Sequence, residues 1–328
     1  MGTLPVGLAR QTGVALDTGG INDKSFNQLS YLGATTSVKK GYASSAEYLP
    51  AASPADYGPN LKKFVDKKCT YIIGVGFALG DAIIASAEAN PTVKYAIVDD
   101  AGLKNFTTPI ANLKGITFKT NENSFLAGYL AAGYSKTGVV ATYGGMPFPT
   151  VTIFMDGFAK GVEYYNDVKG KSVKVLGWDP AKPSAGTMVG DFANTNKALS
   201  ISQNFELQGA DVIFPVAGSL GVTTAENSMK TKKSVTIGVD ADFNLTAPKV
   251  KSAVLISVLK GLNEAVQASV KEAYDGKYSN KQYVGTLKNK GVGLSPLYAP
   301  FNKSIPKSLQ TELKDLQVNV AGGYIPVS

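Results

Sequence analysis

Histidine is absent from the 328-residue chain, and cysteine occurs once, as Cys69. Without histidine the chain cannot build a Ser-His-Asp or Cys-His nucleophile, a histidine-based zinc site or a histidine general base. A single cysteine forms no internal disulfide, and its place at the start of the apolar run "CTYIIGVGF" is typical of a buried, inert thiol. These shortages argue against most hydrolases and deaminases, so we expect no enzymatic activity.

Long hydrophobic runs are also missing. No apolar stretch reaches the ~18 residues of a membrane span, and no secretory signal core is present. The net charge of +8 comes from scattered lysines, without a block of five or more like charges and without interleaved aromatic residues. The sequence therefore predicts no nucleic-acid partner, and the lysines suit a solvated surface or one that faces an anionic cell envelope.

Short apolar runs alternate with helical patterns along most of the chain. Continuous apolar runs that are separated by helices are typical of parallel strands buried on both faces. The sequence thus predicts an α/β fold with doubly wound parallel sheets. The expected strands are "TGVAL", "CTYIIGVGF", "VKYAIVDD", "GITFK", "GVVATYGG", "SVKVLGW", "DVIFPVAG", "SVTIGVD" and "AVLISV". The expected helices include "FNQLSYLGATTSVKKG", "GDAIIASAEANP", "TIFMDGFAKGVEYYND" and "NKALSISQNFELQG".

Changes of pattern divide the chain into two lobes. One boundary is expected near residues 118–123, and another after Asp240, where "SAVLISVLKGLNEAVQASVKEAY" predicts a strand that leads into a long helix. The apolar residues of that helix are expected to begin at Leu255 and to recur with helical spacing. Lys260 would then lie on the helix but outside its apolar face. We expect a multi-crossing hinge between an N-terminal lobe, 1–119 plus 248–284, and a C-terminal lobe, 120–247 plus 285–328.

Polar or aromatic residues follow strand after strand. Parallel sheets bind ligands at the carboxyl ends of their strands, so these residues are candidates for a ligand site. Because they come from both halves of the chain, we expect one site built by two lobes. The residues are Asp17, Phe77, Asp99, Trp178, Gly218 and Asp240.

The junction "DTGGINDKSFNQLSYLGA", which begins at Asp17, carries the clearest chemical pattern. Asp23 is expected to cap the following helix, while Phe26 and Asn27 in its first turn can face the same site as Asp17. A carboxylate, an aromatic face and a carboxamide suit a neutral, planar molecule with hydroxyl or NH groups, whereas they would repel a phosphate. Lys260 beside Asp240 could add a charge-balanced grip on a diol.

Three other motifs fail as cofactor or metal sites. "GVGFALGD" has the spacing G-x-G-x-x-x-G, which differs from a dinucleotide fingerprint, and "GKS" lacks the earlier glycine of a P-loop. "DADFNL" imitates the start of a calcium loop but has Leu245 at the glycine position and Lys251 at the glutamate position. We therefore expect neither a cofactor nor a metal.

Six motifs in order resemble the basic membrane protein (BMP) family over roughly Gly13 to Gly276: "DTGGINDKSFNQ", "ENSFLAGYLAA", "FMDGFAKGVEYY", "DVIFPVAGSLG", "IGVDAD" and "SVLKGLNEAV". The family comprises lipoprotein substrate-binding proteins of ABC transporters, with purine nucleoside receptors as one branch. The resemblance implies a periplasmic-binding-protein type I fold whose lobes close on a nucleoside, which is then delivered to a membrane permease.

The resemblance also implies roles for individual residues. Phe26 would stack on the base, with Asp17 and Asn27 as further contacts of the first lobe. The remaining family positions are Asp99 for the base and Gly218, Asp240 and Lys260 for the ribose. Ser219 and Leu220 depart from the family's run of small residues, which leaves the base preference open.

The expected location is extracytoplasmic, at the cell surface or in the periplasm, and the protein is expected to be a monomer. The family implies an N-terminal lipid on a cysteine that precedes the mature chain. No such cysteine is in the sequence, so the anchor is an expectation from the resemblance alone.

Other functions remain open from the residues alone. A receptor for a sugar or another small polar solute would use the same acids and aromatic rings. A nucleoside hydrolase would need a group that activates water. The effector lobe of a transcription regulator would be preceded by a helix-turn-helix, whereas this chain starts with a strand.

Overall fold

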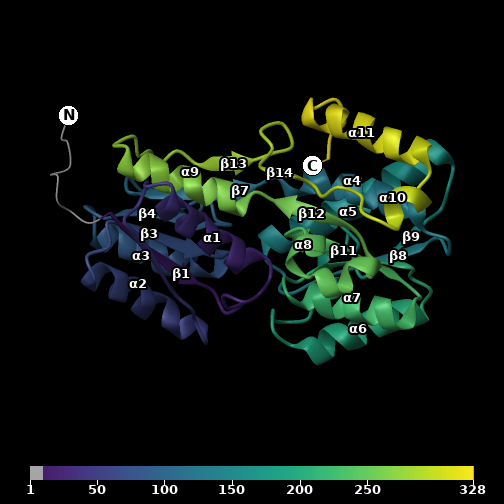
Figure 1. The fold of residues 1–328 in the computed structure, drawn as a ribbon, viewed down its shortest axis with the longest axis horizontal. Coiled ribbons are helices and arrows are strands. Elements are labelled where there is room, and N and C mark those ends of the chain that lie inside the picture. Colours follow the sequence, from purple (N-terminus) through teal and green to yellow (C-terminus); the bar gives the residue numbers. More distant parts are fainter. Residues whose placement is uncertain (1–9, 328) are drawn as a thin grey trace. The chain divides into compact units, whose positions relative to one another are not determined.

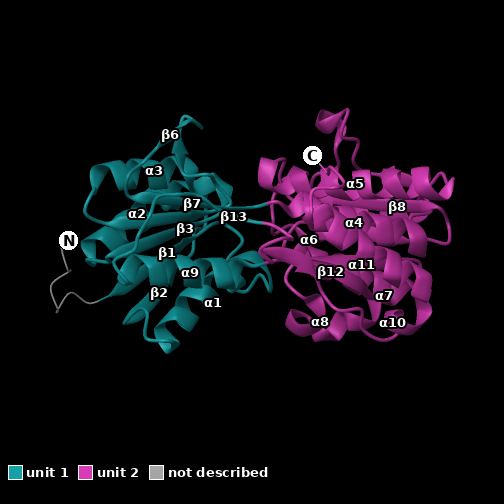
Figure 2. Cartoon of the chain, turned by 90° about the horizontal axis from the view of Figure 1, so that it is seen from above, with its two compact units in different colours: residues 1–118, 261–285 teal, residues 119–260, 286–328 magenta. Residues whose placement is uncertain are grey.

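The described part of the chain, residues 10–327 of a computed structural model, forms two compact units. Unit 1 extends to Phe118 and resumes over Gly261–Gly285, whereas unit 2 comprises Lys119–Lys260 and resumes at Thr286. Figure 2 shows the two units in different colours. The chain passes between the units after Phe118, Lys260 and Gly285.

Unit 1 is centred on a parallel sheet with the strand order β13-β7-β4-β3-β1-β2 (Figure 1). Strand β3 is buried along its whole length because helices cover both faces of the sheet: α1 packs against α9, and α2 against α3. The strands are β1 (Gln11–Leu16), β2 (Ser45–Leu49), β3 (Tyr71–Val75), β4 (Lys94–Val98), β7 (Leu113–Phe118) and β13 (Tyr283–Gly285). The helices are α1 (Phe26–Lys39), α2 (Tyr57–Asp66), α3 (Gly80–Ala89) and α9 (Leu262–Tyr274). A two-stranded hairpin, β5 (Leu103–Lys104) and β6 (Thr108–Pro109), follows β4.

Unit 2 repeats this winding with the strand order β14-β12-β11-β10-β8-β9, in which only β14 is antiparallel to its neighbour. The strands are β8 (Val139–Gly144), β9 (Lys174–Leu176), β10 (Val212–Val216), β11 (Val235–Asp240), β12 (Val254–Lys260) and β14 (Val292–Leu294). The helices are α4 (Thr120–Tyr134), α5 (Pro149–Lys169), α6 (Thr195–Leu207), α7 (Leu220–Thr231), α8 (Phe243–Thr246), α10 (Phe301–Ser304) and α11 (Lys307–Ala321).

Helices α4 and α5 of unit 2 approach each other closely because glycines line their contact. A Cβ on Gly161 would lie 2.0 Å from the carbonyl oxygen of Phe125, and one on Gly128 would lie 2.1 Å from that of Phe158. Any side chain at these positions would force the two backbones apart. The helices therefore pack backbone against backbone at these glycines.

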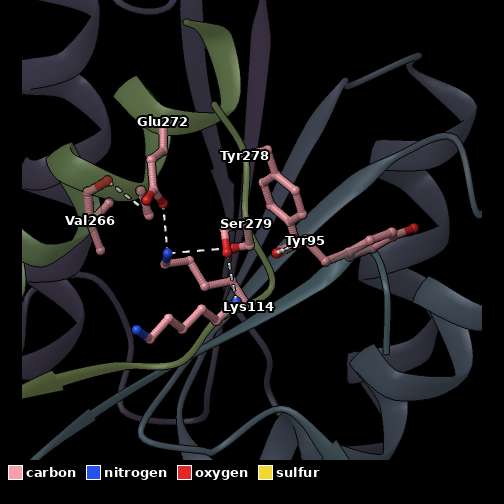
Figure 3. Close-up of polar contacts among 8 residues, drawn as sticks. Tyr95, Lys114, Val266, Glu272, Tyr278 and Ser279 are labelled. Atoms are coloured by element: carbon pink, nitrogen blue, oxygen red, sulfur yellow. Dashed lines mark hydrogen bonds and ion pairs between the residues drawn. The ribbon is translucent and has the colours of Figure 1, made fainter. Parts of the chain in front are cut away.

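The segment Gly261–Gly285 is tied to unit 1 by polar contacts around Lys114 of β7 (Figure 3). The buried Lys114 Nζ lies 2.6 Å from Glu272 Oε2 of α9 and 3.4 Å from the carbonyl oxygen of Ser279. The Tyr278 hydroxyl donates to the carbonyl oxygen of Tyr95. These bonds add to the packing of α9 on α1 and the pairing of β13 with β7, which join this distant segment to the first unit.

The two doubly wound units and the expected strands are confirmed, but two expectations need correction. Residues 248–260 belong to unit 2 rather than to the first lobe, because β12 pairs with β11 in the sheet of unit 2. Lys260 ends β12 and does not lie on a helix, since α9 begins only at Leu262. The apolar run "VLISVL" is a strand buried on both faces, and its hydrophobic residues imitate a helical stripe when they are counted into α9. Within residues 10–327 no helix has both the length and the apolar content needed to cross a bilayer.

Candidate functional site

The first group of candidate residues lies at the carboxyl ends of β1, β3 and β4 in unit 1. The strand β2 lies on one side of β1, and β3 lies on the other. The strand order therefore reverses between β1 and β3, and the carboxyl ends of these two strands form the topological switch point of the sheet. Ligands of open parallel sheets bind at this point. Asp17 directly follows β1, Phe77 opens the turn after β3, and Asp99 directly follows β4.

Asp17 is held in a defined orientation at this switch point. Its Oδ1 accepts hydrogen bonds from Asn27 Nδ2 at 2.7 Å and from the backbone N–H of Gly19 at 2.9 Å. Its other oxygen, Oδ2, would lie 2.8 Å from a Cβ on Gly76, whose φ of +117° also favours glycine. The structure therefore brings the side chains of Asp17 and Asn27 together, and a glycine at the end of the neighbouring strand leaves room for the carboxylate.

The electrostatics of this edge favour ligands that donate hydrogen bonds. Burial raises the pKa of Asp17, while the bonds from Asn27 and Gly19 oppose that rise and the nearby Asp99 carboxylate adds to it. Burial likewise raises the pKa of Asp100, the residue after Asp99. No donor among the described residues reaches the buried Asn27 Oδ1. The side-chain oxygen atoms of Asp17 and Asn27 are thus partly or fully buried hydrogen-bond acceptors at this edge.

Asp23 caps α1, as the sequence predicts. Its carboxylate accepts hydrogen bonds from the backbone N–H groups of Ser25 (3.0 Å), Asn27 (2.7 Å) and Gln28 (3.1 Å). Burial nevertheless raises the pKa of Asp23 from 3.8 to about 6, and the Asp17 carboxylate contributes to the rise. The cap fixes the first turn of α1, which carries Phe26 and Asn27.

Two aromatic residues of unit 1, Phe26 and Phe77, follow the strands β1 and β3. Phe26 is the first residue of α1, and Phe77 begins the turn Phe77–Leu79. Both side chains are partly buried, so each keeps some ring surface accessible. Phe26 therefore lies within the same capped turn as Asn27, the partner of Asp17.

Unit 2 has its own switch point, between β8 and β10. Two partly buried rings that sequence reasoning missed, Phe148 and Phe192, lie here with their centroids 6.3 Å apart. Phe148 directly precedes the first residue of α5, and the Phe192 ring would lie 2.2 Å from a Cβ on Gly145, one residue after β8. The sequence contains a signal for Phe148, because it lies at the start of the helix after β8, one residue before Pro149, much as Phe26 begins the helix after β1.

Asp240 and Lys260 end the adjacent strands β11 and β12 of unit 2. Lys260 Nζ lies 4.0 Å from Asp240 Oδ1 and 5.4 Å from the centroid of the Phe154 ring. Both side chains are buried, with exposed fractions of 8% for Asp240 and 4% for Lys260. The expected pairing of these residues is thus present in the structure, although the distance exceeds a direct hydrogen bond.

Backbone strain marks corresponding positions in the two units. Asp99 after β4 has a φ of +68°, and Asp240 at the end of β11 has a φ of +61°. Such left-handed conformations cost about 1–3 kcal/mol for residues other than glycine and cluster at functional sites. Gly218, after β10, has a φ of +55° with open space around the position of a Cβ.

Trp178, two residues after β9, is surrounded by protein. Its Nε1 donates to Asp156 Oδ1 at 2.9 Å, and its ring would lie 2.5 Å from a Cβ on Gly186. Only 6% of the residue is exposed. These contacts are typical of a side chain that supports a loop.

The described residues contain no group of three or more Cys, Asp or Glu side chains arranged to hold a metal ion. Cys69 is buried, and burial raises the pKa of its thiol to about 11, so the reactive thiolate is scarce near neutral pH.

The comparisons with known proteins agree with this architecture. The family model Bmp, described as ABC transporter substrate-binding protein PnrA-like, matches residues 10–321. The ABC transporter nucleoside-binding protein BmpA of Lactococcus lactis subsp. cremoris is 30% identical over 328 residues, covering 94% of this chain and 88% of that protein. An uncharacterized lipoprotein of Pyrococcus horikoshii is 30% identical and covers 94% of this chain and 75% of its own length.

A crystal structure of an ABC transporter solute-binding protein from Aeropyrum pernix K1 has a TM-score of 0.84 at 22% sequence identity, and the match covers 96% of this chain and 92% of that one. This likeness confirms the expected periplasmic-binding-protein type I fold. By its sequence over residues 10–321 and by its fold, the chain belongs to the Bmp family of ABC transporter substrate-binding proteins.

Proposed function

We propose that this substrate-binding protein receives a nucleoside, with purines as the first candidates, and delivers it to the permease of its transporter. The observation that carries the proposal is the switch point of unit 1, where Asp17, bonded to Asn27, lies next to the capped turn that presents Phe26. The name of the Lactococcus lactis relative, a nucleoside-binding protein, supports the same ligand class.

The base is assigned to unit 1. Phe26 stacks on the base, and Phe77 adds an apolar wall. Asp17, Asn27 and Asp99 accept hydrogen bonds from its N–H groups or from a ribose hydroxyl. Because two of these acceptors are carboxylates in a partly desolvated setting, a phosphate at this edge would be repelled. The assignment therefore favours nucleosides over nucleotides.

The ribose is assigned to unit 2. Asp240 accepts hydrogen bonds from hydroxyl groups, while the Lys260 ammonium donates to hydroxyl oxygens, so a vicinal diol meets both requirements. The open space at Gly218 lets a ligand approach the backbone at the start of α7. Phe192 and Phe148 offer aromatic surface at the switch point of the same unit. Trp178 supports the adjoining loop and does not contact the ligand in this proposal.

The expected affinity follows from these contacts. Stacking one base on an aromatic side chain contributes about 1–3 kcal/mol. Each hydrogen bond to a charged group contributes about 1.5–3 kcal/mol. Several such contacts, less the cost of association, are compatible with binding of roughly −8 kcal/mol, a Kd near 1 μM or below.

The remaining parts of the proposal concern partners and location. The protein acts as a monomer on the extracytoplasmic side, held to the membrane by an N-terminal lipid. The lipoprotein name of the Pyrococcus horikoshii relative supports the anchor. The protein releases the nucleoside unchanged, since a receptor needs no catalytic group.

Isothermal titration with inosine, ribose and inosine monophosphate tests the ligand class. We expect inosine to bind with a Kd near 1 μM or below, and the other two to bind at least tenfold more weakly. Tight binding of ribose with no gain from the base would instead identify a sugar receptor. After long incubation with inosine, chromatography is expected to show no free base, and release of hypoxanthine would contradict the receptor role.

A further inference from the structure

The first turn of α4 begins directly after the first crossing between the units and is almost wholly buried. Within this turn the Asn123 side chain is 0% exposed. Its Nδ2 donates to the carbonyl oxygen of Leu259 at 2.8 Å and to that of Gly293 at 2.7 Å. Both N–H groups of this amide are therefore used on backbone carbonyls.

The two carbonyl groups belong to a cross-strand pair, because Leu259 of β12 is the partner of Gly293 in β14. Strand β14 spans only Val292–Leu294, so its pairing with β12 is short. Leu259 also directly precedes Lys260, the last residue of β12 and the last before the second crossing. Asn123 thus fixes the backbone at the base of a proposed ligand-binding side chain.

Glu122, the neighbour of Asn123, holds the segment after the third crossing. Its Oε2 accepts a hydrogen bond from the backbone N–H of Leu287 at 2.7 Å. One helical turn of unit 2 is therefore bonded to the chain near the second and third crossings, and it directly follows the first.

The helix that carries Asn123 is closely packed. Helix α4 approaches α5 at glycines, and a Cβ on Gly157 of α5 would lie 2.4 Å from the carbonyl oxygen of Asn121. No donor of residues 10–327 reaches the buried Oδ1 of Asn123. A buried acceptor without a protein partner lowers stability. The stabilising polar contacts of this side chain are therefore the two hydrogen bonds that its N–H groups donate.

We infer that Asn123 is a positioning residue for nucleoside binding: by holding the Leu259 carbonyl, it sets the direction in which Lys260 leaves β12 toward the ribose. This inference rests on the proposed role of Lys260. Without the Asn123 bonds the end of β12 would be held by its pairing with β11 and β14 alone, which would let the Lys260 ammonium shift relative to Asp240.

Asn123→Ala and Asn121→Ala form a matched pair of variants. Asn121 lies in the same turn of α4, is also buried, and donates to the carbonyl oxygen of Val327 at 3.1 Å instead of to a carbonyl of β12 or β14. Both variants are expected to melt at lower temperature. Only Asn123→Ala is expected to raise the Kd for inosine, by about tenfold, which lies within the coupling range of residues in one hydrogen-bond network. If Asn123→Ala does not fold, Asn123→Ser keeps one donor and should raise the Kd by a smaller factor.

A double-mutant cycle with Lys260→Met separates positioning from general loosening. Lys260→Met alone is expected to weaken inosine binding, and adding Asn123→Ala should then change the Kd less than about twofold. An equal effect of Asn123→Ala with and without Lys260 would overturn the inference, as would an unchanged Kd in the single Asn123→Ala variant. If Lys260→Met leaves the Kd unchanged, both the ribose assignment and this inference fail, whereas a weakened Lys260→Met beside an unaffected Asn123→Ala refutes this inference alone.

Discussion

Units 1 and 2 wind their strands in the same order, so that β1, β3, β4 and β7 of the first correspond to β8, β10, β11 and β12 of the second. The shared winding extends to single residues. Phe26 and Phe148 stand at the start of corresponding helices, α1 and α5. Asp99 and Asp240 stand at the ends of corresponding strands, and both have a positive φ.

The chemistry of the two switch points differs. In unit 1 the first strand is followed by Asp17, a carboxylate whose pKa is raised by burial and by Asp99. In unit 2 the first strand is followed by Gly145, on which the Phe192 ring packs. The candidate carboxylate of this unit, Asp240, lies near Lys260. The same winding therefore carries two different sets of side chains, acidic residues in unit 1 and an Asp240–Lys260 pair with two aromatic rings in unit 2.

The space around helix glycines differs most between unit 2 and unit 1, and this difference gives the largest expected change in the free energy of unfolding. Gly161→Ala in unit 2 would place its Cβ 2.0 Å from the Phe125 carbonyl oxygen, a backbone atom that cannot turn aside. We expect a loss of about 3 kcal/mol in the free energy of unfolding, at the upper end of the usual cost of overpacking, measured by urea titration. Gly58→Ala in α2 of unit 1 is the control, because nothing lies within 4 Å of its Cβ. It should change stability by less than about 1 kcal/mol, and equal effects of the two variants would contradict the close packing of α4 on α5.

The acid cap of unit 1 predicts a pH dependence. The folded-state pKa of Asp23, about 6, lies above its ordinary value of 3.8, so the folded chain holds this proton more tightly. The contribution of Asp23 to the free energy of unfolding is therefore full below pH ~4 and is lost as the pH rises through ~6, a change of about 3 kcal/mol. Urea unfolding of the ligand-free protein and of Asp23→Asn from pH 4 to pH 7 measures this difference. Parallel pH profiles for the two proteins would show that the buried cap does not titrate as described.

The corresponding rings test which unit stacks on the base. We expect Phe26→Leu to weaken inosine binding by about 1–3 kcal/mol, the value of one stacked base. Phe148→Leu, its counterpart in unit 2, should have a smaller effect because the base is assigned to unit 1. Isothermal titration of both variants decides the matter. A larger loss in Phe148→Leu would reverse the assignment of base and ribose to the two units.

The smallest expected effect concerns the β5–β6 hairpin of unit 1. Phe106 at its turn has a φ of +60° and is 80% exposed, so it bears left-handed strain without burying its ring. Phe106→Gly should raise the free energy of unfolding by up to about 1 kcal/mol, measured by urea titration, because glycine adopts this conformation without a Cβ clash. Phe106→Ala keeps the strain and is the matched control. A gain with alanine as large as that with glycine would point to a cause other than backbone conformation.

Much of the fold could be predicted from the sequence because buried parallel strands carry continuous apolar runs. The run "CTYIIGVGF" predicts β3, and the residues at the ends of such strands, among them Asp17, Asp99 and Asp240, are predicted as site candidates. Strand β2, "SAEYL", was missed because it lies at the sheet edge with only partly buried or exposed residues, which leaves no apolar run.

The remaining parts depend on contacts between distant segments. Whether Lys260 ends a strand or lies on a helix is decided by the pairing of β12 with β11, which the local pattern does not contain. Phe192 becomes a candidate only once its ring is seen against Gly145. The two carbonyl bonds of Asn123 likewise join segments more than 130 residues apart in sequence.

Native mass spectrometry of the freshly purified protein in an equimolar mixture of inosine, ribose and inosine monophosphate tests the ligand class most directly. The acceptor-rich edge of unit 1 and the diol grip of unit 2 predict one added mass per chain, equal to that of inosine. Retention of ribose or of the monophosphate in preference to inosine would contradict the account.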